Sequence, residues 1–221
     1  LTSIKKDGLH RTQSDWDKRN SLNQQVFGGD ITFSCQKFKT GITFVSTVLG
    51  DALQPELQPY NLYYFRGKEQ FNIGLNYKYL WQRIKFFGET AIDSKGSAAI
   101  LNGMIFSPMS RVGLVVLHRS YSEKYQAFYA NSFSEGSQVN NEQGIYVGVE
   151  VRPIKYWKLS AYVDSFRFPW LKYGVDKPSD GRDILFQADY SPKQNVTMYF
   201  RYKYKQKQKN FSIDESVTSM V

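Results

Sequence analysis

The stretch Phe71–Tyr79, with the sequence FNIGLNYKY, alternates apolar and polar residues, and Val196–Tyr204 (VTMYFRYKY) repeats the pattern. Because successive side chains of a strand point to opposite faces, this period of two predicts strands with one apolar and one polar face. Very short polar turns alternate with longer polar loops along the chain, which favours an antiparallel up-and-down meander. Short turns at one end and long loops at the other are typical of transmembrane β-barrels of the outer-membrane type.

The alternating segments predict ten strands. We place them at residues 29–37, 42–50, 62–80, 84–93, 97–107, 112–121, 143–152, 156–166, 183–191 and 196–206. Ser14 is an N-cap candidate followed by acidic residues, so we expect a short helix over about 14–25 that Gly28-Gly29 closes.

The expected organisation has three parts. Residues 1–27 form an N-terminal loop with the short helix, 28–210 carry the β-barrel strands, and 211–221 form a loop toward a missing strand. The fold class is therefore all-β, an antiparallel up-and-down transmembrane β-barrel of about ten strands. Since both ends of the sequence look unfinished, we expect these strands to be part of a larger barrel.

Composition agrees with such a barrel without requiring it. The chain has 221 residues, of which 16% are aromatic, and its mean hydropathy is negative because polar lumen positions offset lipid-facing ones. No apolar run approaches the roughly 18–20 residues of a membrane helix. The net charge of +9 fits either a solvated surface or attraction to phosphates of lipid head groups or nucleic acid. Lys203, Lys205, Lys207 and Lys209 would share one face of an extended chain.

The sequence contains no residue pattern that indicates catalysis or metal binding. Cys35 is the single cysteine and falls in a strand-like segment, which predicts a small apolar filler. The two histidines, His10 and His118, have no metal-ligand spacing, and there is no HExxH, CxxC, GxSxG, GxGxxG or P-loop motif. We therefore expect no catalytic residues, no metal, no cofactor and no enzymatic activity.

Aromatic residues gather near the expected strand ends, as the interfacial girdles of a barrel would. Those on the short-turn side are Tyr79, Trp81, Tyr156, Trp157 and Tyr190. Those toward the long loops are Tyr63, Tyr64, Tyr121, Tyr125, Phe166, Phe168 and Trp170. The ordinary β-propensity of Tyr and Phe is the alternative explanation.

Two groups of residues are functional candidates. Charges that alternate with apolar positions would point into the lumen, because lipid-facing charges cost a few kcal/mol near the midplane. They are Lys85, Glu89, Asp93, Glu150, Arg152, Asp164, Asp189 and Arg201. They would line a pore, or they would form ion pairs that hold a lumen closed. Phe166, Arg167, Phe168 and Trp170 would form a recognition loop, or else extend the preceding strand and pack on its neighbours.

Several ordered motifs resemble a group of Bacteroidetes outer-membrane proteins usually labelled as helix-hairpin-helix-domain proteins. The motifs are Gly8–Thr12, Phe65–Lys68, Phe87–Glu89, Arg119–Tyr121 with Tyr125–Ala127, and Phe166–Leu171. The resemblance covers most of residues 8–205 and implies an outer-membrane barrel. No helix-hairpin-helix sequence is present, so it does not imply DNA binding here.

These observations lead to one expectation and one alternative. We expect an outer-membrane β-barrel that acts as a channel, a translocation component or a structural subunit of a membrane assembly. Its partners would be outer-membrane lipids and other outer-membrane or periplasmic proteins. We expect no nucleic-acid binding through this segment and identify no small-molecule substrate. The alternative is a soluble or surface β-rich module that binds polyanions.

Overall fold

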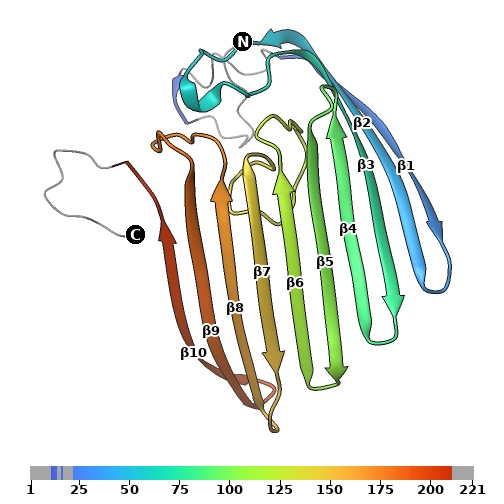
Figure 1. Cartoon of the computed structure of the whole chain (residues 1–221), viewed down its shortest axis with the longest axis vertical. Helices are drawn as coiled ribbons and strands as arrows, with labels where there is room; N and C mark the ends of the chain where they lie inside the picture. Colours follow the sequence, from blue (N-terminus) through green and yellow to red (C-terminus); the bar gives the residue numbers. More distant parts are fainter. Residues whose placement is uncertain (1–10, 14–15, 17–21, 211–221) are drawn as a thin grey trace, which may run out of the picture.

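A computed structural model describes residues 11–13, 16 and 22–210 as one antiparallel sheet of ten strands in sequence order (Figure 1). The strands are β1 (Gln24–Ser34), β2 (Phe38–Leu53), β3 (Gly67–Trp81), β4 (Ile84–Asp93), β5 (Ala98–Met109), β6 (Val112–Tyr121), β7 (Glu142–Val151), β8 (Trp157–Phe168), β9 (Ser179–Lys193) and β10 (Val196–Lys207). A 3-10 turn, η1 (Pro59–Asn61), lies between β2 and β3. The predicted all-β, up-and-down meander is confirmed.

The sheet is open among the described residues. β1 pairs only with β2, and β10 pairs only with β9. Figure 1 shows the short turns gathered at one end of the strands and the long connections at the other. The order of strands and turns agrees with the sequence prediction, whereas closure into a barrel stays a prediction.

Predictions near the N-terminus need correction. The Trp16 amide donates to the Thr12 carbonyl at 3.1 Å, which is one helical turn, but most of the expected helix lies outside the described residues. The expected end of this helix at about residue 25 is wrong, because β1 already begins at Gln24. Gly28 and Gly29 do not close a helix; they pair with β2. Long-range pairing here overrides the local signal for a helix end. The predicted loop at 211–221 lies outside the described residues.

Cys35 also differs from its prediction. It is exposed in the hairpin turn between β1 and β2, where its amide donates to the Phe38 carbonyl at 2.8 Å. β1 ends at Ser34 because the chain reverses direction there. The cysteine is therefore neither in a strand nor an apolar filler of a core.

The register divides the sheet into two faces, because directly paired residues point to the same side. We call the face that carries Arg119, Asp164 and Asp183 the loop-covered face, since the long connections fold over it. The opposite face, which includes Phe44, Val147 and Phe186, we call the open face.

The open face is mostly apolar. Apolar residues of β5 and β6 on it are half-buried, and His118 of β6 is exposed there. Large exposed hydrophobic side chains on this face come from the other eight strands: Phe27, Ile31, Phe33, Ile42, Phe44, Phe71, Ile73, Leu75, Tyr79, Trp81, Ile92, Ile145, Val147, Val163, Phe186, Phe200, Tyr202 and Tyr204. Arg167 and Arg182 lie on this face near the long-loop ends of β8 and β9. No helix of the described residues is long and apolar enough to span a membrane.

Candidate functional site

An ionic cluster centred on Arg119 lies on the loop-covered face. The Arg119 guanidinium donates from Nε to Glu142 at 2.6 Å and from Nη1 and Nη2 to the two oxygens of Asp164 at 2.8 and 3.0 Å. Arg119 and Glu142 are fully buried, and Asp164 is nearly so. Each ion is paired and hydrogen-bonded, as burial of a charge requires. The cluster ties β6, β7 and β8 together.

Glu142 also anchors the loop that joins β6 to β7, residues 122–141. Its carboxylate accepts hydrogen bonds from the backbone amides of Glu135, at 2.8 and 3.0 Å, and Gly136, at 2.9 Å. Phe133 of the same loop lies 5.2 Å from Tyr146 by ring centroids, and the Arg119 guanidinium stacks over its ring. The loop is therefore bound to the ionic cluster and folds over the sheet.

A second set of ion pairs links this loop to β9 and β10. The Glu135 carboxylate lies 2.8 Å from Lys205 Nζ and also pairs with Lys207. Lys203 and Lys205 lie 3.2 and 3.3 Å from Asp183. Burial acts to raise the pKa of Glu135, but the two lysines outweigh it and hold that pKa below its ordinary value. The loop carboxylate is thus held in its charged form.

The 122–141 loop reaches the opposite edge of the sheet as well. The Tyr129 hydroxyl accepts a hydrogen bond of 2.6 Å from the Gln24 side chain on β1. The loop therefore joins β1 to β10 across the loop-covered face, although those two strands do not pair with each other.

Buried contacts fix the middle of the loop. The Gln126 amide donates to Asp93 at 3.0 Å, and its carbonyl accepts from Gln70 and Asn72 at 2.9 and 2.8 Å. Tyr125 is 3% exposed, and burial, with smaller effects from Glu89 and Asp93, raises its pKa to about 12. These bonds make the loop an integral part of the fold.

The predicted lumen residues lie mostly on one face. By register Lys85, Glu89, Asp93, Glu150, Asp164, Asp189 and Arg201 occupy the loop-covered face. Arg152 follows the end of β7 and pairs with Glu150 at 2.8 Å, both largely exposed. Whether this face lines a lumen stays a prediction.

The structure brings only some of these residues together. Arg201 donates to Gln187 at 2.7 Å, Gln187 donates to Asp189 at 2.6 Å, and Lys158 lies 3.2 Å from Asp189. Asp93 and Asp164 belong to the loop contacts and the Arg119 cluster. Lys85 and Glu89 form no ion pair within the described part of the chain.

Of the two expectations for Phe166–Trp170, the structure supports the extension of the preceding strand for most of the residues. Phe166, Arg167 and Phe168 belong to β8, which extends to Phe168, so that alternative is confirmed and a recognition loop that begins at 166 is wrong. Phe166 and Phe168 are buried with centroids 5.6 Å apart, so their rings are not available to a partner. Arg167 is exposed on the open face, and only Trp170 lies in the connection, donating from Nε1 to the Pro59 carbonyl at 3.1 Å.

The expected aromatic girdles are only partly found. On the short-turn side Tyr79, Trp81, Tyr156 and Trp157 are exposed, and Trp157 lies 5.0 Å from Tyr190. On the other side the expected residues do not form an outward ring. Tyr121, Phe166 and Phe168 are buried on the loop-covered face, and Tyr125 is buried within the 122–141 loop.

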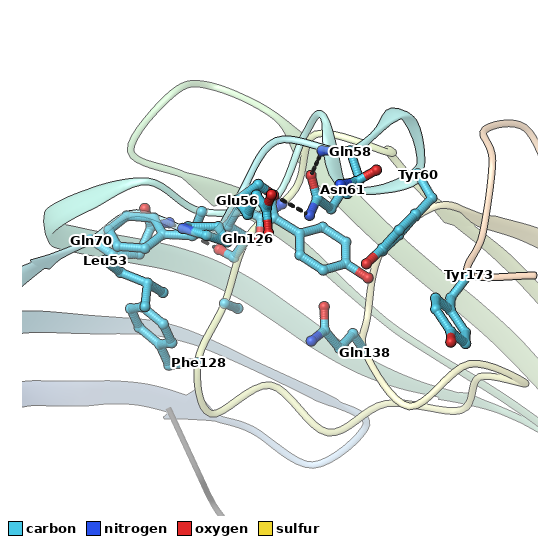
Figure 2. Close-up of a pocket in the computed structure, with 14 residues that line it drawn as sticks. Leu53, Glu56, Gln58, Tyr60, Asn61, Gln70, Gln126, Phe128, Gln138 and Tyr173 are labelled. Carbon is cyan, nitrogen blue, oxygen red and sulfur yellow. Dashed lines mark hydrogen bonds between the residues drawn. The ribbon is translucent and has the colours of Figure 1, made fainter. Parts of the chain in front are cut away.

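A cavity of about 720 Å³ lies at the long-loop end between the 54–66 connection and the 122–141 loop (Figure 2). Tyr60, Tyr64, Phe128 and Tyr173 contribute aromatic rings to its lining, and several glutamines contribute amides. This volume is within the range of small-molecule sites, roughly 300–1,000 Å³.

No sequence pattern indicated Glu142, Glu135, Asp183 or the role of Arg119. Arg119 faces the same side as Tyr121, in a strand that carries no Asp, Glu or Lys, and such an isolated full charge was an available signal. The carboxylate partners of Arg119 could not be found from spacing, since Glu142 comes from β7 and Asp164 from β8. Among the described residues no group of three or more His, Cys, Asp or Glu side chains could hold a metal ion.

Comparison of the chain with protein-family models, with curated proteins and with solved structures finds no match. The resemblance to Bacteroidetes outer-membrane proteins stays a prediction. The proposed function therefore depends on the two faces of the sheet and on the 122–141 loop that covers one of them.

Proposed function

We propose that the chain forms part of an outer-membrane β-barrel whose interior is the loop-covered face. The observation that carries this proposal is the largely apolar open face, which has exposed hydrophobic side chains near both edges of the sheet. Most charged strand residues lie opposite, and the charges on the open face, Glu69, Arg167, Asp180 and Arg182, lie near the long-loop ends of their strands. An outward apolar band with a polar interior is the arrangement that lets strands cross a bilayer. A soluble sandwich would need a second sheet to cover this face, and the described residues contain one sheet.

The interior of this barrel is obstructed by the 122–141 loop. The loop is bonded to β1 through Tyr129, to β3 and β4 through Gln126, and to β10 through Glu135. The buried Arg119 cluster lies beneath it. We therefore favour a plugged barrel, acting as a structural subunit or as a channel that opens only when the loop is displaced, over a freely open pore.

The polyanion-binding alternative has less support. Lys203, Lys205 and Lys207 do share one face, as expected, but they are paired with Asp183 and Glu135. Paired lysines offer little net charge to a phosphate-rich partner.

Planar-bilayer conductance of the full-length protein tests the proposal. We expect membrane insertion without frequent open steps for the wild type, and more frequent steps when Glu135→Gln and Tyr129→Phe together weaken the contacts of the loop with β10 and β1. Large, stable steps of the wild type would contradict the plugged barrel. A protein that stays soluble without detergent and does not enter bilayers would contradict the barrel itself.

A further inference from the structure

The cavity at the long-loop end has the composition of a ligand site rather than of a packing defect. The 54–66 connection supplies Tyr60 and Tyr64, and the 122–141 loop supplies Phe128 and Gln138. Figure 2 shows Tyr60 above Gln138, with Tyr173 to the right of both, and the Tyr60 and Tyr173 ring centroids are 5.5 Å apart. Rings and amides from separate segments therefore converge on one space. We propose that this cavity binds a neutral oligosaccharide at the long-loop end of the molecule.

The walls of the cavity are fixed without a ligand. Asn61, 5% exposed, donates to the Glu56 carbonyl at 2.8 Å and accepts from the Gln58 amide at 2.9 Å. Arg66 donates to the carbonyls of Asn61, Leu62 and Tyr64 at 3.0–3.2 Å. A preformed site loses little conformational entropy on binding, so modest contacts suffice for affinity.

The floor joins the two loops. The Gln126 side chain donates to the Tyr63 carbonyl at 2.6 Å, and the Phe65 and Phe128 rings meet edge to face at 5.0 Å. Gly67, two residues after Phe65, has φ of +138°, which favours glycine at the point where the chain turns from this wall into β3. The cavity is therefore held open by contacts that do not involve its free polar groups.

Several polar groups on the lining have no partner. The amide of Gln138, the hydroxyls of Tyr60 and Tyr64 and the carboxylate of Glu56 make no hydrogen bond to any residue that the structure describes. Amides and hydroxyls both donate and accept, which matches the hydroxyls of a sugar. Aromatic faces carry negative charge density and attract the C–H faces of a pyranose ring.

The charge of the lining narrows the class of ligand. Among the described lining residues there is no lysine or arginine, and Glu56 carries the only formal charge. An anionic ligand would meet no cation, and a lipid tail would leave the amides without partners. A neutral, hydroxyl-rich ligand satisfies both the rings and the amides.

Isothermal titration calorimetry of the full-length protein tests this inference, in a detergent without a sugar head group. The probes are cellohexaose, maltohexaose, xylohexaose, mannohexaose and chitohexaose, with hexagalacturonate and hexalysine as charged controls. We expect saturable binding of at least one neutral probe and none of the charged controls. Tyr173→Ala, at an 83% exposed lining residue, should weaken binding about tenfold without changing the fold.

Gln138→Leu, also at an exposed position, should weaken binding similarly, whereas Tyr199→Ala on β10, outside the cavity lining, should leave it unchanged. The inference is overturned if no neutral probe binds saturably, if either charged control binds as well as the neutral probes, or if both cavity variants bind normally. Because the assay does not depend on a bilayer, sugar binding by a protein that fails to insert would contradict only the proposed function.

Discussion

Gly144 on β7 lies directly against the Arg119 guanidinium on β6, and a Cβ at this glycine would stand 2.6 Å from Arg119 Cζ. The absence of a side chain at position 144 is what leaves room for the buried cation between Glu142 and Asp164. Gly144→Ala should therefore displace Arg119 and destabilise the protein by about 1–3 kcal/mol, the usual cost of overpacking. Urea unfolding followed by tryptophan fluorescence measures the change.

The matched control is Gly113→Ala on β6, where an added Cβ would meet nothing within 4 Å. We expect its unfolding free energy to stay within about 0.5 kcal/mol of the wild type. Equal effects of the two substitutions would contradict the assigned role of Gly144.

Removing the guanidinium itself should cost more. Arg119→Ala leaves Glu142 and Asp164 buried without their cation, and loss of one partner of a buried ion pair costs about 3–5 kcal/mol. Arg152→Ala, at a side chain that is 59% exposed, should cost less than about 1 kcal/mol. The same denaturant titration compares both variants, and a small effect of Arg119→Ala would show that the cluster does not stabilise the sheet.

Acidification should release the 122–141 loop. The pKa of Glu135 in the folded protein lies below its ordinary value of 4.5, so its stabilising contribution is present above pH 4.5 and is lost as pH falls through the folded pKa. Hydrogen–deuterium exchange of the loop amides, measured by mass spectrometry across pH 3–7 and divided by the intrinsic exchange rate at each pH, should show protection that falls toward low pH. In Glu135→Gln the protection should be low already at pH 7 and should vary less with pH, and identical profiles would exclude Glu135 as the titrating group.

A charged residue introduced on the open face should reduce the free energy of unfolding if that face meets lipid. Val147→Arg places a cation in the middle of β7 on this face, and the expected cost is about 2–4 kcal/mol of folding free energy in liposomes. Tyr199→Arg, at an exposed position of the loop-covered face, should cost much less. Equal costs in a folding titration would indicate that the two faces meet the same solvent.

The sequence was sufficient to predict the strands, because period-two alternation is a local property that each segment carries alone. Ile84–Asp93 and Val112–Tyr121 have the predicted bounds for this reason. Short turns between such segments also predict the meander order, because a turn of a few residues can join two strands only if they lie next to each other and run antiparallel.

The candidate site was less predictable, because its partners are brought together by register and by a loop. Glu135 meets Lys205 across 70 positions of sequence, and no spacing rule connects them. Phe166 and Phe168 resemble exposed loop aromatics in sequence, yet they are buried because β8 extends further than its alternation suggested. Cys35 was misplaced because a turn of three residues interrupts an alternation that continues on both sides.

Spin labelling of neighbouring residues in liposomes tests the central claim most directly. Cysteines are introduced one at a time at Val147, Val163 and Phe186 on the open face and at Tyr146, Tyr162 and Leu185 on the loop-covered face, in a Cys35→Ser background. If the open face meets lipid, labels at Val147, Val163 and Phe186 collide with oxygen far more often than with an aqueous nickel reagent. Labels at Tyr146, Tyr162 and Leu185 should show no such preference for oxygen. Labels on both faces that respond equally to the aqueous reagent would contradict a transmembrane sheet.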